Sequence, residues 1–173
     1  IYGAPLEQER PSVPGATGLV ELAPDELRNI EEDFFVLHSS ILAEAATNNQ
    51  DTDSFWRGNP ASWTDLHAGV DIPRAIGVQL RRKVVDLLQQ RGNSTVELHH
   101  SPGAGGTTAA LRCAWDLRRD FPVCVLRRHS TTTADRVDQL FRLTDKPVLL
   151  VCDAPLISIG AREDLYIELV KRH

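Results

Sequence analysis

The sequence predicts an α/β protein in which helices cover a parallel β-sheet and an α-helical extension precedes the sheet. Two observations support this class. From residue 95 onward, short apolar runs typical of strands alternate with helical patterns, as they do in parallel sheets. The composition is that of a globular protein, with 42% hydrophobic and 25% charged residues. No apolar run is long enough to cross a membrane, so we expect no membrane partner.

The amino-terminal part is predicted to form an extension with one amphipathic helix. Residues 1–23 are proline-containing and aperiodic, which indicates an irregular lead-in. A helix is expected over 24–46, where proline and acids open the first turn and apolar residues recur at steps of three and four. The polar run 47–54 is interpreted as a linker. We therefore divide the chain into an extension, 1–54, and the first part of the main domain, 55–173.

The region after the linker is aromatic but lacks periodicity. Residues 55–69 are expected to form an ordered loop anchored by Trp56 and Trp63. Such tryptophans could stack on an adenine, but anchoring a loop to the core is the commoner role. A second helix is predicted over 74–90 and ends before Gly92, a typical residue after a helix.

Three strand–helix units follow this helix. They are strand 95–100 with helix 107–119, strand 123–127 with helix 134–143, and strand 147–153 with helix 161–172. The three cysteines, Cys113, Cys124 and Cys152, contain no C-x-x-C pair, and two lie in apolar runs. They are interpreted as buried reduced thiols of a cytoplasmic protein rather than as a disulfide framework or a zinc site.

The stretch HHSPGAGGTT, residues 99–108, has the form of a phosphate-binding loop. In a Walker A motif, G-x-x-x-x-G-K-[ST], the glycines let backbone N–H groups surround a phosphate at the start of a helix. Here Gly106 stands in place of the lysine, and His100 stands in place of the first glycine. The turn nevertheless lies between a predicted strand and a predicted helix, which is the context that such a site requires.

A second marker lies further along the chain. The apolar run VLLVC ends at Asp153, as a Walker B strand ends in an acid that holds Mg²⁺ directly or through water. Each marker alone is weak, but both occur in the order and frame of a nucleotide-binding domain. His99 and His100 are not expected to chelate one metal, because adjacent strand residues point to opposite faces.

Together these motifs resemble a known family. The pattern H-x-PGxGGTT, the helix RCAWDLRRDF and the VLLV-x-D strand are similar to the NTPase module of the sterile-alpha-motif antiviral restriction factors. That module belongs to the STAND class of signalling P-loop NTPases. The upstream pieces DELRNIEEDFFVLHSS and FWRGNPASW also resemble the segment before the module, so the likeness extends from about residue 18 onward.

The resemblance implies a fold. It is a three-layer P-loop NTPase-like parallel sheet with an α-helical amino-terminal extension. In STAND-type sheets the strand after Walker B lies between the Walker B strand and the P-loop strand. Because helix 161–172 runs almost to the last residue, we expect a sheet that is incomplete at its carboxyl-terminal end. We also expect, since the chain begins with Ile1 and contains no Met, that it is a segment of a longer protein.

The resemblance also implies residue roles, and a loop without lysine is a recurring form in that family. The residues implied to bind the phosphates are Gly103, Ala104, Gly105, Gly106, Thr107 and Thr108. Thr107 and Asp153 are implied to hold the Mg²⁺ of Mg·ATP. Ile72, Pro73 and Arg74 occupy the position of a segment that lines the base. Residue 154 is Ala, where many hydrolysing relatives carry a second acid, which puts hydrolysis in doubt more than binding.

The positive group that replaces the lysine is left open by the sequence. His100 is near in sequence and could donate a hydrogen bond to a phosphate. An arginine from a neighbouring subunit or from another part of a longer chain is the other candidate. Arg127 and Arg128 end a strand that STAND-type sheets place at the edge, away from the phosphates.

The functional expectation is nucleotide binding, with ATP as the nucleotide and weak or absent hydrolysis. Because STAND proteins act as nucleotide-gated oligomerisation switches, self-association or contact with other domains is expected, in cytoplasmic antiviral or stress signalling. The alternative is a degenerate P-loop-fold interaction module that binds no nucleotide. The net charge of −5 argues against nucleic acid as a partner.

Overall fold

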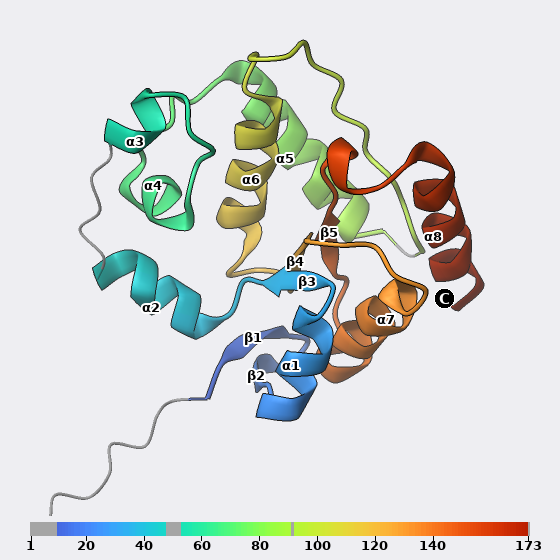
Figure 1. The fold of residues 1–173 in the computed structure, drawn as a ribbon. Coiled ribbons are helices and arrows are strands. Elements are labelled where there is room, and N and C mark those ends of the chain that lie inside the picture. The colour runs from blue at the N-terminus through green and yellow to red at the C-terminus, as the bar shows by residue number, and fades with distance from the viewer. Residues whose placement is uncertain (1–9, 48–52, 91, 173) are drawn as a thin grey trace, which may run out of the picture.

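The computed structural model describes residues 10–47, 53–90 and 92–172. Its helices and strands are arranged around one small central sheet (Figure 1). In chain order they are β1 (Ser12–Gly15), β2 (Gly18–Glu21), α1 (Pro24–Glu31), β3 (Phe34–Val36), α2 (Ser39–Thr47), α3 (Asp53–Trp56), α4 (Trp63–Ala68), α5 (Ala75–Leu88), α6 (Gly106–Leu117), β4 (Val123–Leu126), α7 (Thr133–Thr144), β5 (Leu149–Val151), the 3₁₀ helix η1 (Ala154–Leu156) and α8 (Ile159–Arg172).

The central sheet is mixed rather than parallel. Within the described residues its strand order is β3–β4–β5, and β1 and β2 form a separate two-stranded sheet. β4 and β5 run parallel, with Val123 opposite Leu149. β3 runs antiparallel to β4, with Phe34 opposite Leu126. The predicted parallel pairing is found for β4 and β5, and it is corrected at the edge, where residues from the expected extension supply an antiparallel strand.

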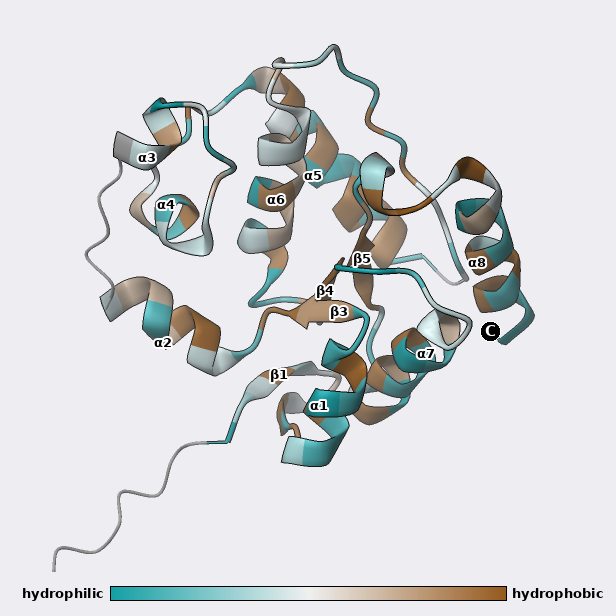
Figure 2. Ribbon diagram, in the orientation of Figure 1, coloured by the Kyte–Doolittle hydropathy of each residue, from teal (hydrophilic) through white to brown (hydrophobic). Residues whose placement is uncertain are grey.

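Helices lie on both faces of the central sheet, whose strands are coloured as hydrophobic (Figure 2). The apolar side chains of the sheet pack with side chains of these helices in two clusters. On one face, Phe34, Val36 and Leu126 pack with side chains of α1, α7 and α8. On the other face, Phe35 and Val123 pack with side chains of α2, α4 and α6. Since successive side chains of a strand point to opposite faces, the continuous apolar runs FFV, VCVL and LLV suit a sheet that is covered on both sides.

The amino-terminal predictions are corrected by β3. The helix expected over 24–46 is divided, because α1 ends at Glu31, β3 follows, and α2 begins at Ser39. The FFV run is aromatic and β-branched, and its pairing with β4 outweighs the helical spacing of its apolar residues. The expected irregular lead-in contains the β1–β2 pair, and the linker residues 48–52 lie outside the described residues.

The loop expected at 55–69 is only partly correct. Its ends belong to the short helices α3 and α4. The Trp63 ring stacks between Phe35 and Trp115, with centroid distances of 5.7 Å and 5.9 Å, so Trp63 is an anchor as predicted. Trp56 is 59% exposed and anchors nothing in the core. The difference arises because a ring is anchored only where the tertiary fold brings other side chains to it.

The later elements agree with the sequence predictions. α5, α6, α7 and α8 lie within two residues of the predicted helices at each end, and β4 and β5 fall inside the predicted strands 123–127 and 147–153. These segments are strongly periodic or continuously apolar, and both patterns identify an element without knowledge of its neighbours.

The strand predicted for residues 95–100 does not form. Residues 93–100 have no strand pairing and are held by α8 instead. The Asn93 side chain donates to the Leu169 carbonyl at 3.0 Å, and the Tyr166 hydroxyl donates to the Asn93 carbonyl at 3.3 Å. A cavity of about 980 Å³ is lined by this segment, by β5 and by helices α5 to α8. The prediction fails because, in the described chain, no strand lies beside this segment.

Asp33 links the amino-terminal elements to α7. Its fully buried carboxylate accepts hydrogen bonds from the Ser130 hydroxyl at 2.6 Å, the Thr133 hydroxyl at 2.8 Å and the Arg136 guanidinium. Burial is the largest single effect and opposes the charged form, but these hydrogen bonds and the Arg136 charge together lower the pKa of Asp33. The ionised carboxylate therefore joins the start of β3 to the start of α7.

We expect Asp33→Asn to lower the free energy of unfolding by about 3 kcal/mol, because it removes the charge that Arg136 faces inside the protein. Since folding lowers the pKa of Asp33, its contribution is present above the pKa of the unfolded chain and is lost as the pH falls through the pKa of the folded state. Urea unfolding at neutral and acidic pH measures both effects. Asp25→Asn, which removes an exposed partner of Arg28, is the control, and equal losses for both variants would contradict the prediction.

Candidate functional site

The turn before α6 has the backbone form of a tight loop. Gly103 and Gly105 have φ angles of 75° and 79°, which L side chains rarely adopt. The Ala104 N–H donates to the Ser101 carbonyl at 3.0 Å and closes the turn. Glycine is therefore required at both positions by the turn itself. The Ala104 N–H, which was expected to bind phosphate, is already used within the turn.

The helix that follows has no side-chain cap at its amino terminus. α6 begins at Gly106, and its N-cap residue, Gly105, supplies no side-chain hydrogen bond. The first N–H groups of a helix have no acceptor within the helix and carry partial positive charge. The expected phosphate-binding residues Thr107 and Thr108 lie in this first turn, where they would meet an anion that approaches the helix end.

His100 lies against Gly106. The Cδ2 and Nε2 atoms of its ring are 1.8 Å and 2.2 Å from the position that a Cβ atom at residue 106 would take. The ring Nδ1 is 3.1 Å from the Ser101 carbonyl oxygen. No side chain fits at residue 106 while the ring is there. The two positions at which the loop departs from a Walker A motif are therefore in contact.

Arg74 reaches the same loop from the start of α5. Its Nη1 donates to the Ala104 carbonyl at 2.6 Å, and its guanidinium atoms lie 3.6–3.8 Å from the Cβ position of Gly105. Ile72 and Pro73 precede it and are exposed. The segment that the sequence placed at the base side of a nucleotide thus lies beside the glycine turn, 30 residues away in sequence.

An ion pair holds this segment on α6. The Arg112 Nε donates to Asp71 at 2.9 Å, its Nη2 donates to the other oxygen of the same carboxylate, and Nη2 also donates to the Leu66 carbonyl at 2.7 Å. The hydrogen bond with Asp71, which is buried, raises the pKa of Arg112. The sequence did not reveal the role of Arg112, because its partner lies 41 residues away. The one sequence feature that could have indicated an ion pair is the acidic residue Asp71, just before a predicted helix.

Thr107 and Asp153 line the same cavity of about 980 Å³. Asp153 directly precedes η1, just after β5, as expected for a Walker B acid. Among the described residues, no group of three or more His, Cys, Asp or Glu could hold a metal ion. A cation here would therefore need phosphate and water oxygens as well, which is how Mg²⁺ is usually held beside a nucleotide.

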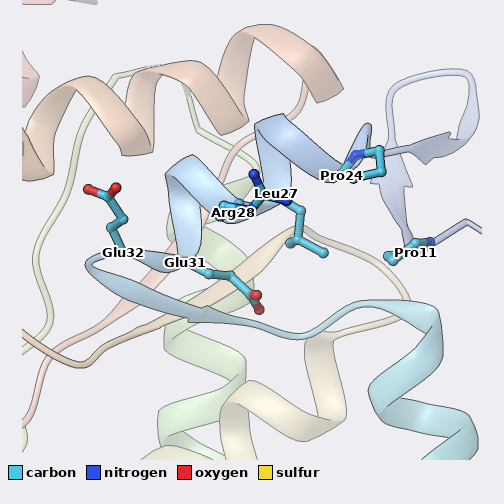
Figure 3. Close-up of a pocket in the computed structure, with 6 residues that line it drawn as sticks. All are labelled: Pro11, Pro24, Leu27, Arg28, Glu31 and Glu32. Atoms are coloured by element: carbon cyan, nitrogen blue, oxygen red, sulfur yellow. The ribbon is translucent and has the colours of Figure 1, made fainter.

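A second cavity, of about 500 Å³, lies on the amino-terminal elements (Figure 3). It is lined by Pro11, Pro24, Leu27, Arg28, Glu31 and Glu32. The two carboxylates point away from each other, and Glu32 is paired with Arg136. Burial raises the pKa of Glu31, although a backbone hydrogen bond with Val36 and the charge of Arg127 oppose the rise. This cavity contains none of the predicted site residues and presents no converging polar groups.

The cysteines are not candidates for nucleophilic chemistry. Cys113, Cys124 and Cys152 are free thiols. Burial raises the pKa of all three, and for Cys113 and Cys152 it does so to about 11. Such thiols stay protonated near neutral pH, and the thiolate is the reactive form.

Comparison with known proteins identifies the class. Residues 53–169 match the family described as Novel STAND NTPase 5, so the chain belongs to this family of STAND NTPases. The resemblance seen in the sequence is thereby confirmed, and the chain is a STAND-type NTPase-related module. Within the described ranges, no helix is long and apolar enough to span a bilayer.

The chain is similar to sterile alpha motif domain-containing protein 9-like from Homo sapiens, with 29% identity over 119 residues. The Mus musculus protein of the same name is 28% identical, and human sterile alpha motif domain-containing protein 9 is 24% identical. Each comparison covers 58% of this chain and 8% of the relative. No solved structure shows a significant match.

We expect Arg112→Leu to lower the free energy of unfolding by about 3 kcal/mol, because it leaves the Asp71 carboxylate buried without its partner. In a double-mutant cycle with Asp71→Asn, the two losses should be non-additive by more than about 1 kcal/mol. Denaturant unfolding of the four proteins measures this coupling. Arg82→Leu, at an exposed position of α5, is the control, and additive losses for Arg112 and Asp71 would contradict the anchoring role.

Proposed function

We propose that the glycine turn and the start of α6 bind the phosphates of Mg·ATP, as part of a STAND-type switch. The observation that carries this proposal is the amino terminus of α6, which no side chain caps and which follows a tight glycine turn, in a member of a STAND NTPase family. An acid that follows β5 and lines the same cavity as Thr107 supports it.

The proposed roles follow from the position of each residue. The N–H groups of Gly105, Gly106, Thr107 and Thr108 meet the phosphates, while Gly103 and Ala104 shape the turn. Thr107 and Asp153 hold Mg²⁺ through the hydroxyl and the carboxylate. Ile72, Pro73 and Arg74 lie beside the turn and are proposed to border the nucleotide on its base side.

We also propose the finer fold that such a site implies, a three-layer P-loop sheet. In that arrangement a further strand lies between β5 and residues 95–100, which do not pair with each other in the described chain. The cavity of about 980 Å³ between them has room for such a strand. The proposed biological role is a cytoplasmic antiviral, innate-immune or stress-signalling switch that oligomerises or contacts other domains in response to nucleotide.

A second candidate is a P-loop-fold interaction module that binds no nucleotide. It is favoured by the His100 ring, which covers one side of Gly106, and by the Ala104 N–H, which is engaged within the turn. Titration of the protein with Mg·ATP separates the two candidates, since saturable binding supports the switch and its absence supports the module.

We expect Thr107→Ala to weaken Mg·ATP binding about tenfold and to weaken magnesium-free ATP binding less, because the lost hydroxyl contacts the metal. Calorimetric titration with and without Mg²⁺ measures the difference. Thr131→Ala, an exposed threonine before α7, should leave both affinities unchanged. If Thr107→Ala left the magnesium dependence intact, the hydroxyl would not be a metal ligand.

We expect hydrolysis by this chain to be slow or absent, because the loop lysine and the second Walker B acid are replaced by Gly106 and Ala154. Enzymes commonly turn over at roughly 1 to 10³ per second, and the release of phosphate from Mg·ATP should stay far below that range. A sample with Asp153→Asn controls for contaminating ATPases. Rapid turnover that Asp153→Asn abolishes would show that another residue performs the chemistry.

A further inference from the structure

The two replaced positions of the loop motif are neighbours in space. A Walker A motif has glycine at its first position and lysine before the final threonine or serine. In this chain those positions are His100 and Gly106, and the His100 ring overlaps the space that a Cβ atom at residue 106 would fill. A bulky residue and a small one have thus exchanged places across the loop.

This contact makes the two replacements depend on each other. A lysine at residue 106 would place its Cβ 1.8 Å from the ring, far inside van der Waals contact. A side chain at residue 106 would therefore require the exposed His100 ring to leave its present position. The ring atoms Cδ2 and Nε2 lie where a lysine side chain at residue 106 would begin, beside the first residue of α6.

The hydrogen bond of the ring sets its chemistry. A carbonyl oxygen only accepts, so the contact of Nδ1 with the Ser101 carbonyl places a proton on Nδ1. In the neutral ring, Nε2 then carries a lone pair, which a phosphate oxygen repels. Protonation at Nε2 converts this atom into a charged donor, and histidine is the side chain whose charge changes most readily near neutral pH.

We propose that His100 replaces the loop lysine and binds the nucleotide phosphates as an imidazolium through Nε2. This inference rests on the proposed nucleotide site and adds the group that neutralises its ligand. Because only a protonated imidazole presents a charged donor at Nε2, we expect affinity to rise as the pH falls from 8 to 6. The site would therefore respond to pH, unlike one that carries a lysine.

The other charged groups near the loop have partners or roles of their own. Arg162, which lines the same cavity, is paired with Glu97 at 3.2 Å. Arg74 keeps its charge at every pH considered and already donates to the Ala104 carbonyl, so it adds a constant attraction. Asp153 lines the cavity and is assigned to the metal. His99, the neighbouring histidine, lies 3.1 Å from Glu97 and is directed to that carboxylate.

The test is calorimetric titration of the full chain with Mg·ATP at pH 6 and pH 8. Wild type should bind more tightly at pH 6. His100→Gln should bind about tenfold more weakly at pH 6 and lose most of the difference between the two pH values. Any pH dependence of affinity that remains in His100→Gln comes from protonation of the nucleotide or of other side chains. His99→Gln is the matched control and should keep the wild-type behaviour.

A second pair of variants tests the exchange of positions. Gly106→Lys alone should bind worse than wild type, whereas His100→Gly combined with Gly106→Lys should bind at least as well and without the His100 pH dependence. Circular dichroism checks that each variant folds. If Gly106→Lys does not fold, recovery of folding in the combined variant would also show that lysine at residue 106 is tolerated only when the His100 ring is absent.

Two results would overturn the inference. Unchanged or tighter binding by His100→Gln would show that the ring is idle or blocks the site, while the proposed function would stand. If wild type and the combined variant both failed to bind Mg·ATP, the proposed function would fail as well. Binding by the combined variant alone would make His100 a plug and would reject both proposals for the natural chain.

Discussion

The buried strand β4 is the constraint on which the rest of the structure depends. Its residues Val123–Leu126 are apolar and three of the four are buried, so the backbone groups on both of its edges need hydrogen-bond partners. β3 pairs with one edge in antiparallel fashion, and β5 pairs with the other in parallel. The first pairing draws the amino-terminal elements into the core, and the second places Asp153 at the end of β5.

The candidate site is built by contacts between segments that are distant in sequence. The ion pair of Asp71 with Arg112 fastens the start of α5 to α6 and so brings Arg74 to the glycine turn. Residues 93–97 are held by α8 on the opposite side of the large cavity. His100, Gly106 and Thr107 line that cavity together with Asp153, although they belong to different parts of the chain.

The two replaced positions of the loop, residues 100 and 106, are best understood together, because their side chains would compete for the same space. Gly106 alone would look like the loss of a function, and His100 alone would look like an obstruction. Their contact shows that a side chain at residue 106 would require the exposed His100 ring to move, whereas glycine at residue 100 would leave that space free. The family match covers this loop, and in the local geometry the His100 ring occupies the space that a side chain at residue 106 would fill.

Local pattern was sufficient for the periodic helices α5 to α8, for the apolar strands β4 and β5, and for the glycine turn, whose positive φ angles are a property of glycine itself. The local pattern was insufficient where a segment is compatible with more than one kind of secondary structure. Phe34–Val36 have helical spacing as well as strand-forming side chains, and only the presence of β4 selects the strand. Residues 95–100 have strand composition but no strand beside them in the described chain. The contacts of Arg112 with Asp71 and of His100 with Gly106 were likewise decided by tertiary structure, because the energy of a side-chain contact depends on distance in space and leaves no periodic signal in the sequence.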